Sequence, residues 1–263
     1  YKRQIIFICV GTPTKNNTNS ADLKYVFKVV HELKKIISKY KIIVTKSTVP
    51  VTTGDKIEKI LFKLKKKNLV DVVSNPEFLR EGEAISDFSR PDRVIIGTNS
   101  KKANAKMKSL YMPIIKKNSR YFNTSRRGAE LIKYASNAFL ATKISFINEL
   151  ANLCEKTGVD IKDISQGMGS DQRIGERFLR AGPAYGGSCF PKDTRALIDT
   201  ANQFKTDLTI VKSVISSNNS RKLLLTKRLE KILDGKLVNK TVTFLGVTFK
   251  PNTDDMREAS SVP

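Results

Sequence analysis

Short apolar runs alternate with helical patterns along the first half of the chain, and this alternation restricts the fold more than any other feature. The runs are rich in β-branched residues and lie at 4–10, 41–46, 70–73 and 93–97. Apolar residues at helical spacing follow at 23–37, 57–64 and 103–111. Such runs are typical of strands buried on both faces of a parallel sheet, and the intervening helices supply right-handed crossovers. The sequence therefore predicts an α/β fold with a doubly wound parallel sheet.

From about Arg126 the pattern changes to long helical stretches. Residues 129–156 contain neither proline nor glycine and keep helical apolar spacing throughout, which predicts one long helix. We expect helical structure to dominate through about Leu229, followed by a strand at 241–247 and a loop at 249–258. The chain should therefore divide into three parts, namely an α/β part at 1–125, a helical part at 126–236 and the start of a second α/β part at 237–263.

The chain is strongly basic. Its 48 lysines and arginines outnumber 25 acidic residues, which gives a formal charge of +23 over 263 residues. Such an excess favours anionic partners, and nucleic acid is one class to consider. The basic residues are nevertheless spread over nearly every predicted helix, with no zinc finger, recognition helix or aromatic-interleaved basic strip beside them. We therefore expect a solvated basic surface that contains specific anion sites, and a basic nucleic-acid-binding module is the alternative.

Cysteine and histidine are scarce. Cys9, Cys154 and Cys189 are far apart and lack C-x-x-C spacing, so we expect neither a disulfide framework nor a metal site. The single histidine, His31, falls on a predicted helix among charged residues, where we expect a solvated side chain. Acid–base chemistry must then rest mainly on lysines and carboxylates. No apolar run has transmembrane length and no leader opens the chain, so we expect a cytoplasmic location.

The loop at 182–193 contains a candidate nucleophile. It places Cys189 after two glycines and before Lys192 and Asp193. This arrangement suits a thiolate nucleophile, because glycines let the backbone approach a ligand closely and a neighbouring ammonium favours the anionic sulfur. On its spacing alone, the pattern also fits a small buried cysteine next to an ordinary Gly-Gly turn, and both interpretations stay open at this point.

Two polar pairs have a spacing of four residues. Lys133 and Asn137 fall near the start of the long predicted helix and project from one face of it. An ammonium and a carboxamide aimed at one point can stabilise an oxyanion, although such a pair is commonly a solvated helix face. Glu77 and Glu81 follow the strand predicted at 70–73, and they are either catalytic carboxylates or the acids of a first helical turn.

The octapeptide Gly-Gly-Ser-Cys-Phe-Pro-Lys-Asp at 186–193 resembles the active-site signature of the UDP-glucose/GDP-mannose dehydrogenase family. Further motifs match in consistent order along the chain. The resemblance implies a Rossmann-like NAD-binding domain, a central dimerisation domain with a long spine helix, and a UDP-binding domain. It also implies NAD-dependent twofold oxidation of UDP-glucose to UDP-glucuronate, with UDP-N-acetylmannosamine or GDP-mannose as alternative substrates.

Within that resemblance, each polar residue singled out above acquires a role. Cys189 matches the nucleophile that forms a thiohemiacetal and then a thioester. Lys133 and Asn137 match the pair that stabilises the oxyanion. Glu77 matches a residue that contacts the substrate and serves as acid and base in thioester hydrolysis, which requires a carboxylate whose protonation is tuned by its surroundings.

Other matched positions hold groups in place or bind ligands. Thr48 and Asp193 match residues that hold a water and the catalytic groups, although Ser-Thr-x-Pro is otherwise an ordinary turn and Asp193 an ordinary N-cap. The matched cofactor-binding positions are Val10, Gly11, Thr12, Pro13, Thr14, Ser47, Glu81, Lys192 and Arg257. The matched substrate-binding positions, besides Glu77, Lys133 and Asn137, are Phe78, Leu79, Arg80, Arg173, Phe178, Leu179, Tyr185, Gly186 and Lys250.

The resemblance also implies how much of the family's architecture the chain contains. The fingerprint Gly-x-Gly-x-x-Gly does not occur in it, so we expect the first βαβ unit, on the order of 70 residues, to be missing. Most of the UDP-binding domain should be missing as well. The family implies a homodimer through the long central helix, with no membrane and no nucleic-acid partner. An inactive fragment that acts only as an oligomerising module is the alternative from another class.

Overall fold

The computed structural model describes residues 3–15, 18–62, 67–115 and 119–263. Their contacts divide the chain into two compact units, Tyr1–Ala135 and Ser136–Pro263. None of the helices within the described ranges is both long and apolar enough to cross a membrane. Residues 63 and 64 of the helix predicted at 57–64 lie outside these ranges.

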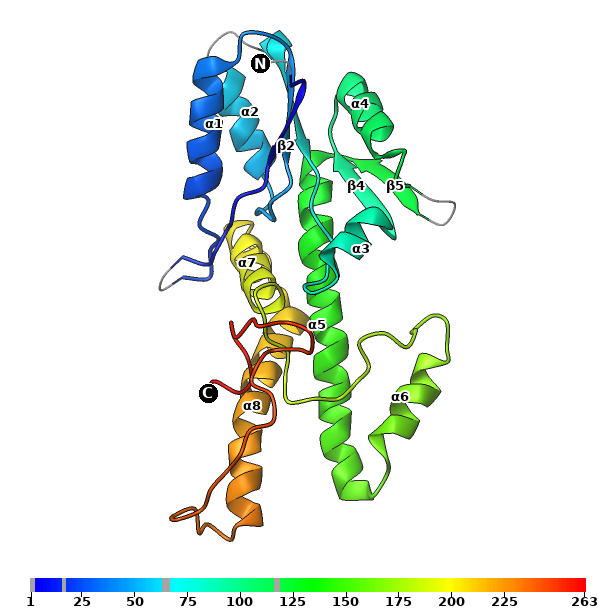
Figure 1. The fold of residues 1–263 in the computed structure, drawn as a ribbon, viewed down its shortest axis with the longest axis vertical. Coiled ribbons are helices and arrows are strands. Elements are labelled where there is room, and N and C mark those ends of the chain that lie inside the picture. Colours follow the sequence, from blue (N-terminus) through cyan, green and yellow to red (C-terminus); the bar gives the residue numbers. More distant parts are fainter. Residues whose placement is uncertain (1–2, 16–17, 63–66, 116–118) are drawn as a thin grey trace. The chain divides into compact units, whose positions relative to one another are not determined.

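Unit 1 is built on a five-stranded sheet (Figure 1). Its strands follow one another in the order β1 (Ile5–Ile8), β2 (Lys41–Thr45), β3 (Val70–Ser74), β4 (Arg93–Gly97) and β5 (Arg120–Thr124). The α/β class and the first four strands are confirmed, whereas β5 was not expected from the sequence. Pairing is parallel from β1 to β3 and between β4 and β5.

The junction between β3 and β4 departs from the expected parallel arrangement. These strands pair in antiparallel orientation at Ser74 and Gly97. A parallel connection needs a crossover that packs across the sheet. The segment between the two strands contains only the six-residue helix α3 (Ala84–Ser89), which buries no residue. Without a packed crossover helix, the chain returns in the opposite direction.

Helices cover both faces of the sheet (Figure 1). Helices α1 (Lys24–Ile36) and α2 (Thr53–Phe62) share one apolar cluster with the sheet, and α4 (Lys101–Tyr111) shares another. Strand β2 supplies both clusters because its side chains alternate, with Ile43 on one face and Ile42 and Val44 on the other. The doubly wound arrangement is thereby confirmed. A short 3₁₀ helix, Lys67–Leu69, precedes β3.

Three details of helix α1 follow from the sequence. The carboxylate of Asp22 accepts a hydrogen bond from the Lys24 N–H at 3.0 Å, just before the first turn of this helix. His31 is exposed on α1, as expected. The apolar residues at helical spacing point inward, with Val26 and Val30 fully buried.

The long helix predicted at 129–156 is confirmed as α5 (Arg126–Thr157). It begins in unit 1 and continues into unit 2. Its first turn is joined to α2 by Arg126, whose guanidinium lies 3.0 Å from Asp55 and 2.8 Å from Glu58. The side chain of Arg126 is only 10% exposed, so this network joins the two helices out of water, where ion pairs require close geometry.

Unit 2 is helical, as expected. After α5 come α6 (Ile161–Gly169), α7 (Phe190–Gln203) and α8 (Thr209–Ile232). The predicted strand at 241–247 is wrong, because within the described part of unit 2 no strand pairs with it and Leu245 is 95% exposed. A strand requires a neighbour for its backbone hydrogen bonds. The loop predicted at 249–258 is confirmed as a series of turns.

Candidate active site

Two turns meet at the carboxyl ends of β1 and β2 in unit 1. The Thr12 hydroxyl donates a hydrogen bond to the Thr48 carbonyl at 2.8 Å, and the Ser47 hydroxyl donates one to the Val10 carbonyl at 2.7 Å. Thr48 itself is buried. Space is open around Gly11, where an added Cβ would touch nothing within 4 Å. Turns at this edge of an open α/β sheet are where ligands bind.

Lys133 is a buried ammonium. Only 3% of the residue is exposed, and its Nζ lies 3.0 Å from Oε1 of Glu77. The other Glu77 oxygen accepts a hydrogen bond from the Leu79 N–H at 2.6 Å, which fixes the carboxylate. Two cations lie over the ring of Phe78, with Lys133 Nζ at 5.2 Å and the Arg93 guanidinium at 4.1 Å from its centroid. The structure thus brings together two predicted catalytic residues on an aromatic surface.

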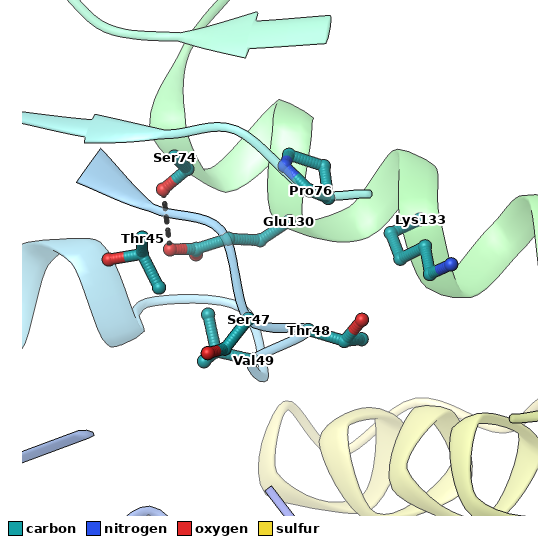
Figure 2. A pocket seen from close by; sticks show the side chains of 8 residues that line it. All are labelled: Thr45, Ser47, Thr48, Val49, Ser74, Pro76, Glu130 and Lys133. Carbon is teal, nitrogen blue, oxygen red and sulfur yellow. Dashed lines mark hydrogen bonds between the residues drawn. The ribbon is translucent and has the colours of Figure 1, made fainter. Parts of the chain in front are cut away.

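A small cavity opens beside these groups. Its lining combines the end of β2 and the turn after it, the end of β3 with the residues that follow, and the first turns of α5, namely Thr45, Ser47, Thr48, Val49, Ser74, Pro76, Glu130 and Lys133. Figure 2 shows Glu130 reaching from α5 toward Ser74, while Lys133 leaves the following turn of the same helix in another direction. The two carboxylates near Lys133 therefore have different neighbours, since Glu77 pairs with the ammonium and Glu130 bonds to Ser74.

Sequence reasoning missed two charged residues of this region. Burial raises the pKa of Glu130 to about 7, against the lowering effect of its hydrogen bonds to Gly54, Ser74 and Thr52. Burial also lowers the pKa of Lys46 to about 8, opposed mainly by the charge of Glu77. In the sequence, the position of Glu130 is typical of an acid in the first turn of a helix, and the position of Lys46 is typical of a residue at the end of a strand. Neither pattern indicates burial.

Other predicted positions in unit 1 make local contacts. The Arg80 guanidinium lies 2.6 Å from both Glu83 and Asp87, so the structure directs it to surface carboxylates. Glu81 is half-buried. The remaining predicted cofactor positions, Pro13 and Thr14, belong to the turn after β1, where the Pro13 carbonyl accepts a hydrogen bond from the Asp22 N–H.

Cys189 stands at the start of α7 in unit 2. It is the N-cap residue of that helix, with proline in the first turn behind it. The thiol is free and half-buried, and its Sγ lies 3.7 Å from the Ser188 hydroxyl. The interpretation of Asp193 as the N-cap of this helix is therefore wrong, because Asp193 lies within the first turn. The positive end of the helix dipole faces the thiol.

Asp193 contacts two other predicted residues, Asn137 and Lys192. Its side chain is 1% exposed, and Oδ2 accepts a hydrogen bond from the Asn137 amide at 2.6 Å. The Lys192 ammonium lies 2.6 Å from Oδ1. Lys192 is thus engaged by the neighbouring carboxylate. The contact fixes the orientation of the Asn137 amide, because its nitrogen must face the carboxylate and its oxygen must point elsewhere.

The backbone of the cysteine loop is held by two polar residues of α8 and one of α5. Asn218 accepts a hydrogen bond from the Tyr185 N–H at 2.8 Å and donates one to the Tyr185 carbonyl at 3.0 Å. The Gly182 N–H donates to Asn148 at 2.8 Å, and Arg221 donates to the Gly182 carbonyl at 2.9 Å. Sequence reasoning missed these three residues, since their partners lie more than thirty positions away.

We expect Asn218→Ala to lower stability, because it leaves the buried Tyr185 N–H and carbonyl without partners. Asn218 is 4% and Tyr185 5% exposed, so water does not replace the lost bonds. The cost should be about 2 to 6 kcal/mol, the sum for two unpaired buried groups. Urea unfolding followed by circular dichroism measures it. Exposed Asn202→Ala on α7 serves as the control, and equal midpoints for the two variants would contradict the prediction.

The two glycines before the cysteine allow the segment near the end of the chain to approach. A Cβ at Gly186 would lie 2.3 Å from the Glu258 carbonyl, and one at Gly187 would lie 2.6 Å from the Phe249 ring. Gly187 also has φ of +80° and donates its N–H to the Arg257 carbonyl at 2.8 Å. A side chain is therefore excluded at both positions. Lys250 lies in the same segment, with its ammonium 5.9 Å from the Phe249 ring.

Aromatic rings surround Phe190 in the first turn of α7. The rings of Phe178 and Tyr185 each lie 6.1 Å from it. Leu179 is buried, and its carbonyl accepts a hydrogen bond from Ser165. The structure thus brings two of the predicted substrate positions, Phe178 and Tyr185, to the ring of Phe190.

Two predicted arginines are bound to nearby carboxylates. The Arg173 side chain is 89% exposed and lies 2.6 Å from Asp171. The Arg257 side chain is 67% exposed and lies 2.8 Å from Asp255. Both arginines stay at the surface, where their guanidinium groups can exchange a carboxylate for a phosphate.

Comparison with known families covers most of the chain. The model for the NAD binding domain of the UDP-glucose/GDP-mannose dehydrogenase family matches residues 1–115. The model for the central domain of the same family matches residues 127–220. The two matches follow one another without overlap, in the order expected from the motifs.

Individual proteins are similar to nearly the whole of this chain. A UDP-glucose 6-dehydrogenase of Rhizobium meliloti is 47% identical over 98% of the chain and 60% of its own length. A protein of the same name from Pseudomonas aeruginosa is 49% identical over 98% of the chain and 58% of its own length. A solved UDP-glucose dehydrogenase from Pyrobaculum islandicum has 39% identity and a TM-score of 0.92, covering 98% of this chain and 60% of that one. The chain therefore spans about 60% of the length of these relatives.

Proposed function

Because the chain belongs to the UDP-glucose/GDP-mannose dehydrogenase family, we propose that its protein oxidises UDP-glucose twice, to UDP-glucuronate, with NAD as the hydride acceptor. The observation that carries this proposal is the position of Cys189 at the N-terminus of α7, followed within one turn by a buried Asp193 bonded to Asn137. A free thiol at a helix N-terminus with a fixed carboxamide nearby suits addition to a carbonyl.

The first oxidation converts the C6 alcohol of the sugar to an aldehyde, with loss of one hydride and one proton. NAD, when bound, accepts the hydride in each oxidation. Lys133 stabilises the oxygen that becomes negative as the proton leaves, because a buried ammonium interacts more strongly with such charge than a solvated one. The Glu77 carboxylate, 3.0 Å from Lys133, receives the proton in this proposal.

The second oxidation requires the thiol. An aldehyde releases hydride poorly, so the Cys189 thiolate first adds to C6 and forms a thiohemiacetal with a tetrahedral carbon. Loss of the second hydride gives a thioester. Asn137 donates to the developing oxyanion, and Asp193 holds the Asn137 amide in place.

Hydrolysis of the thioester completes the reaction. Glu77 takes a proton from the attacking water, which adds to C6, and the carbon–sulfur bond breaks to leave the carboxylate and the Cys189 thiol. Thr48 and Asp193 orient the water and the groups around it. The net change is one alcohol and one water converted to one carboxylate, with two hydrides transferred and three protons released.

The residues present fit a dinucleotide at the carboxyl edge of the sheet. The open turn from Val10 to Thr14 and the hydroxyl of Ser47 lie there, and the backbone at Gly11 is accessible. A flat ring and a diphosphate can approach such a turn closely only where side chains are small. In unit 2, Arg257 is the cation that the family resemblance assigns to the cofactor phosphates.

A direct assay tests this function. The complete gene product that contains this chain is incubated with NAD and either UDP-glucose, UDP-N-acetylmannosamine or GDP-mannose, and NADH is followed by absorbance. We expect two NADH per UDP-glucose consumed. Preference for another nucleotide sugar would support the alternative substrates, although the named relatives at 47% and 49% identity favour UDP-glucose. If no NADH forms with any of the three nucleotide sugars, the proposed function is rejected.

A nucleic-acid-binding role can be tested in parallel. A basic module that binds DNA loses affinity steeply as salt rises. We expect no mobility shift of DNA at moderate salt, since the named relatives and structures are all dehydrogenases.

We also propose a homodimer through α5. On this helix, Phe139, Phe146 and Leu153 are spaced by seven residues and are 65%, 48% and 58% exposed. Residues seven apart lie on one stripe of a helix, and an exposed apolar stripe favours a partner. A second copy of the chain presents the same stripe, so a twofold contact is self-complementary.

We expect Phe146→Glu to convert a dimer to monomer, because it introduces a charge into the centre of the stripe. Sedimentation velocity of the purified protein measures the change. Phe204→Glu is the matched control, since Phe204 is 57% exposed at the end of α7 and lies outside the stripe. A dimer that survives Phe146→Glu at micromolar concentration would contradict the proposed interface.

A further inference from the structure

The Glu130 carboxylate is surrounded by hydrogen-bond donors from two other segments of unit 1. Oε2 accepts from the Thr52 N–H at 2.8 Å, and Oε1 accepts from the Gly54 N–H at 2.8 Å and the Ser74 hydroxyl at 3.0 Å. The residue is 3% exposed, so these bonds form away from water, where charge-assisted bonds are strong. We call Glu130 with Thr52, Gly54 and Ser74 the Glu130 clamp.

Each segment held by the clamp carries one proposed catalytic residue. The turn that contains Thr52 also contains Thr48, and Ser74 precedes Glu77 by three residues. Glu130 itself precedes Lys133 by three residues on α5, about one helical turn. One carboxylate therefore fixes the relative positions of the three chain segments from which Thr48, Glu77 and Lys133 extend.

The fit around the carboxylate is tight. A Cβ at Gly54 would lie 2.9 Å from Oε1, so a larger residue there would displace the carboxylate. Thr52 has φ of +81°, an uncommon conformation for a β-branched residue. Such a backbone persists where the surrounding structure holds it, and the bond from its N–H to Glu130 is one such restraint.

A purely structural role is already filled by another link between the same helices. Arg126 on α5 bonds to Asp55 and Glu58 on α2, so the helices remain joined without Glu130. We propose that Glu130 is a positioning residue that sets the spacing of Thr48, Glu77 and Lys133 for the dehydrogenase reaction. This inference rests on the proposed function. Glu130 would affect the reaction only by holding Thr48, Glu77 and Lys133 in place.

Protonation of Glu130 changes the clamp near neutral pH. Burial raises its pKa to about 7, and the groups that face it are Asp55 and the backbone of α2, Ser74 of β3, and Arg126 and Lys133 of its own helix. A protonated carboxyl turns one acceptor oxygen into a donor, so it no longer matches three donors. We therefore expect the clamp to loosen as pH falls through about 7.

The stability effect has the opposite sign. The pKa of folded Glu130 is raised above its ordinary value of 4.5, so the folded protein binds the proton more tightly than the unfolded one. The resulting stabilisation is complete below about pH 4.5 and is lost as pH rises through about 7. Across that window the unfolding equilibrium constant of the wild type should rise on the order of a hundredfold relative to that of Glu130→Gln.

Hydrogen exchange tests the clamp independently of activity. Glu130→Ala should accelerate exchange of the Thr52 and Gly54 amides at least about tenfold, the factor that a lost charge-assisted bond implies. Glu130→Gln keeps one acceptor oxygen and should restore protection in part. Glu58→Ala removes one of the two carboxylates that Arg126 joins to α5, and should leave these two amides protected. Unchanged exchange in folded Glu130→Ala would overturn the clamp.

Steady-state kinetics of the complete gene product test whether the Glu130 clamp affects catalysis. Glu130→Ala should lower kcat about a hundredfold, with a smaller change in KM for UDP-glucose, because misplaced catalytic groups affect the transition state most. We expect the kcat of the wild type to fall below about pH 7, as the clamp loosens. Glu130→Gln should recover part of kcat and should not show this fall. Glu58→Ala should retain kcat. If the wild type forms NADH and folded Glu130→Ala matches its kcat, the positioning role is wrong. If the wild type forms none, the proposed function fails, while hydrogen exchange still decides the clamp.

Discussion

Cys189→Ser should abolish formation of UDP-glucuronate while leaving UDP-glucose binding largely intact. Serine retains the size of the side chain, but its hydroxyl is far less acidic than a thiol and adds poorly to an aldehyde at neutral pH. We expect the rate of acid formation to fall on the order of 10⁴-fold or more, as for the loss of other covalent nucleophiles. Chromatography of the sugar nucleotide product, with calorimetry for substrate binding, provides both measurements.

The other cysteines provide the control for this prediction. Cys154 is a free thiol in the same unit, 7% exposed on α5, and Cys154→Ala removes it without touching the loop that holds Cys189. This variant should keep most of the activity of the wild type. Release of NADH by Cys189→Ser at the wild-type rate, with UDP-glucuronate as the product, would reject the covalent mechanism.

The sequence predicted those parts of the fold whose pattern is local. The alternation of apolar runs and helices specifies β1 to β4 and the helices around them, because strands buried on both faces need continuous apolar residues. The direction of β4 was not predictable in this way, since it depends on whether the chain after β3 packs a helix across the sheet. At 241–247 the residues have strand propensity, but propensity without a neighbouring strand does not form a sheet.

The same distinction applies to the site. Cys189 and Asp193 lie within one turn of α7, so a short motif indicates their association. Glu130 and Asn218 bond to backbone groups 76 and 33 positions away, and a single sequence contains no signal for such pairs. Their partners are N–H and carbonyl groups, which every residue carries. Only the folded chain reveals that these side chains are buried.

Lys133→Met should lower kcat and kcat/KM for UDP-glucose together, by about 100- to 1000-fold. Methionine keeps an unbranched side chain of similar length, so the change removes the charge and its hydrogen bonds while preserving most of the packing on the Phe78 ring. The magnitude is that of a lost donor to a developing oxyanion. Steady-state kinetics over a range of UDP-glucose concentrations separates kcat from KM.

The structure specifies what would contradict this role. Lys133 Nζ lies 3.0 Å from Glu77 and both groups are at least partly buried, so Lys133→Met also leaves a carboxylate without its ion pair and lowers stability. Lys133→Met/Glu77→Gln removes that unpaired charge and should recover stability. Because Glu77 is itself a proposed base, the kcat of the double variant is compared with that of Glu77→Gln alone, and should lie well below it. Lys156→Met, at an exposed position near the end of α5, should leave both unchanged. A double variant whose kcat equals that of Glu77→Gln would mean that Lys133 supports the fold and takes no part in the chemistry.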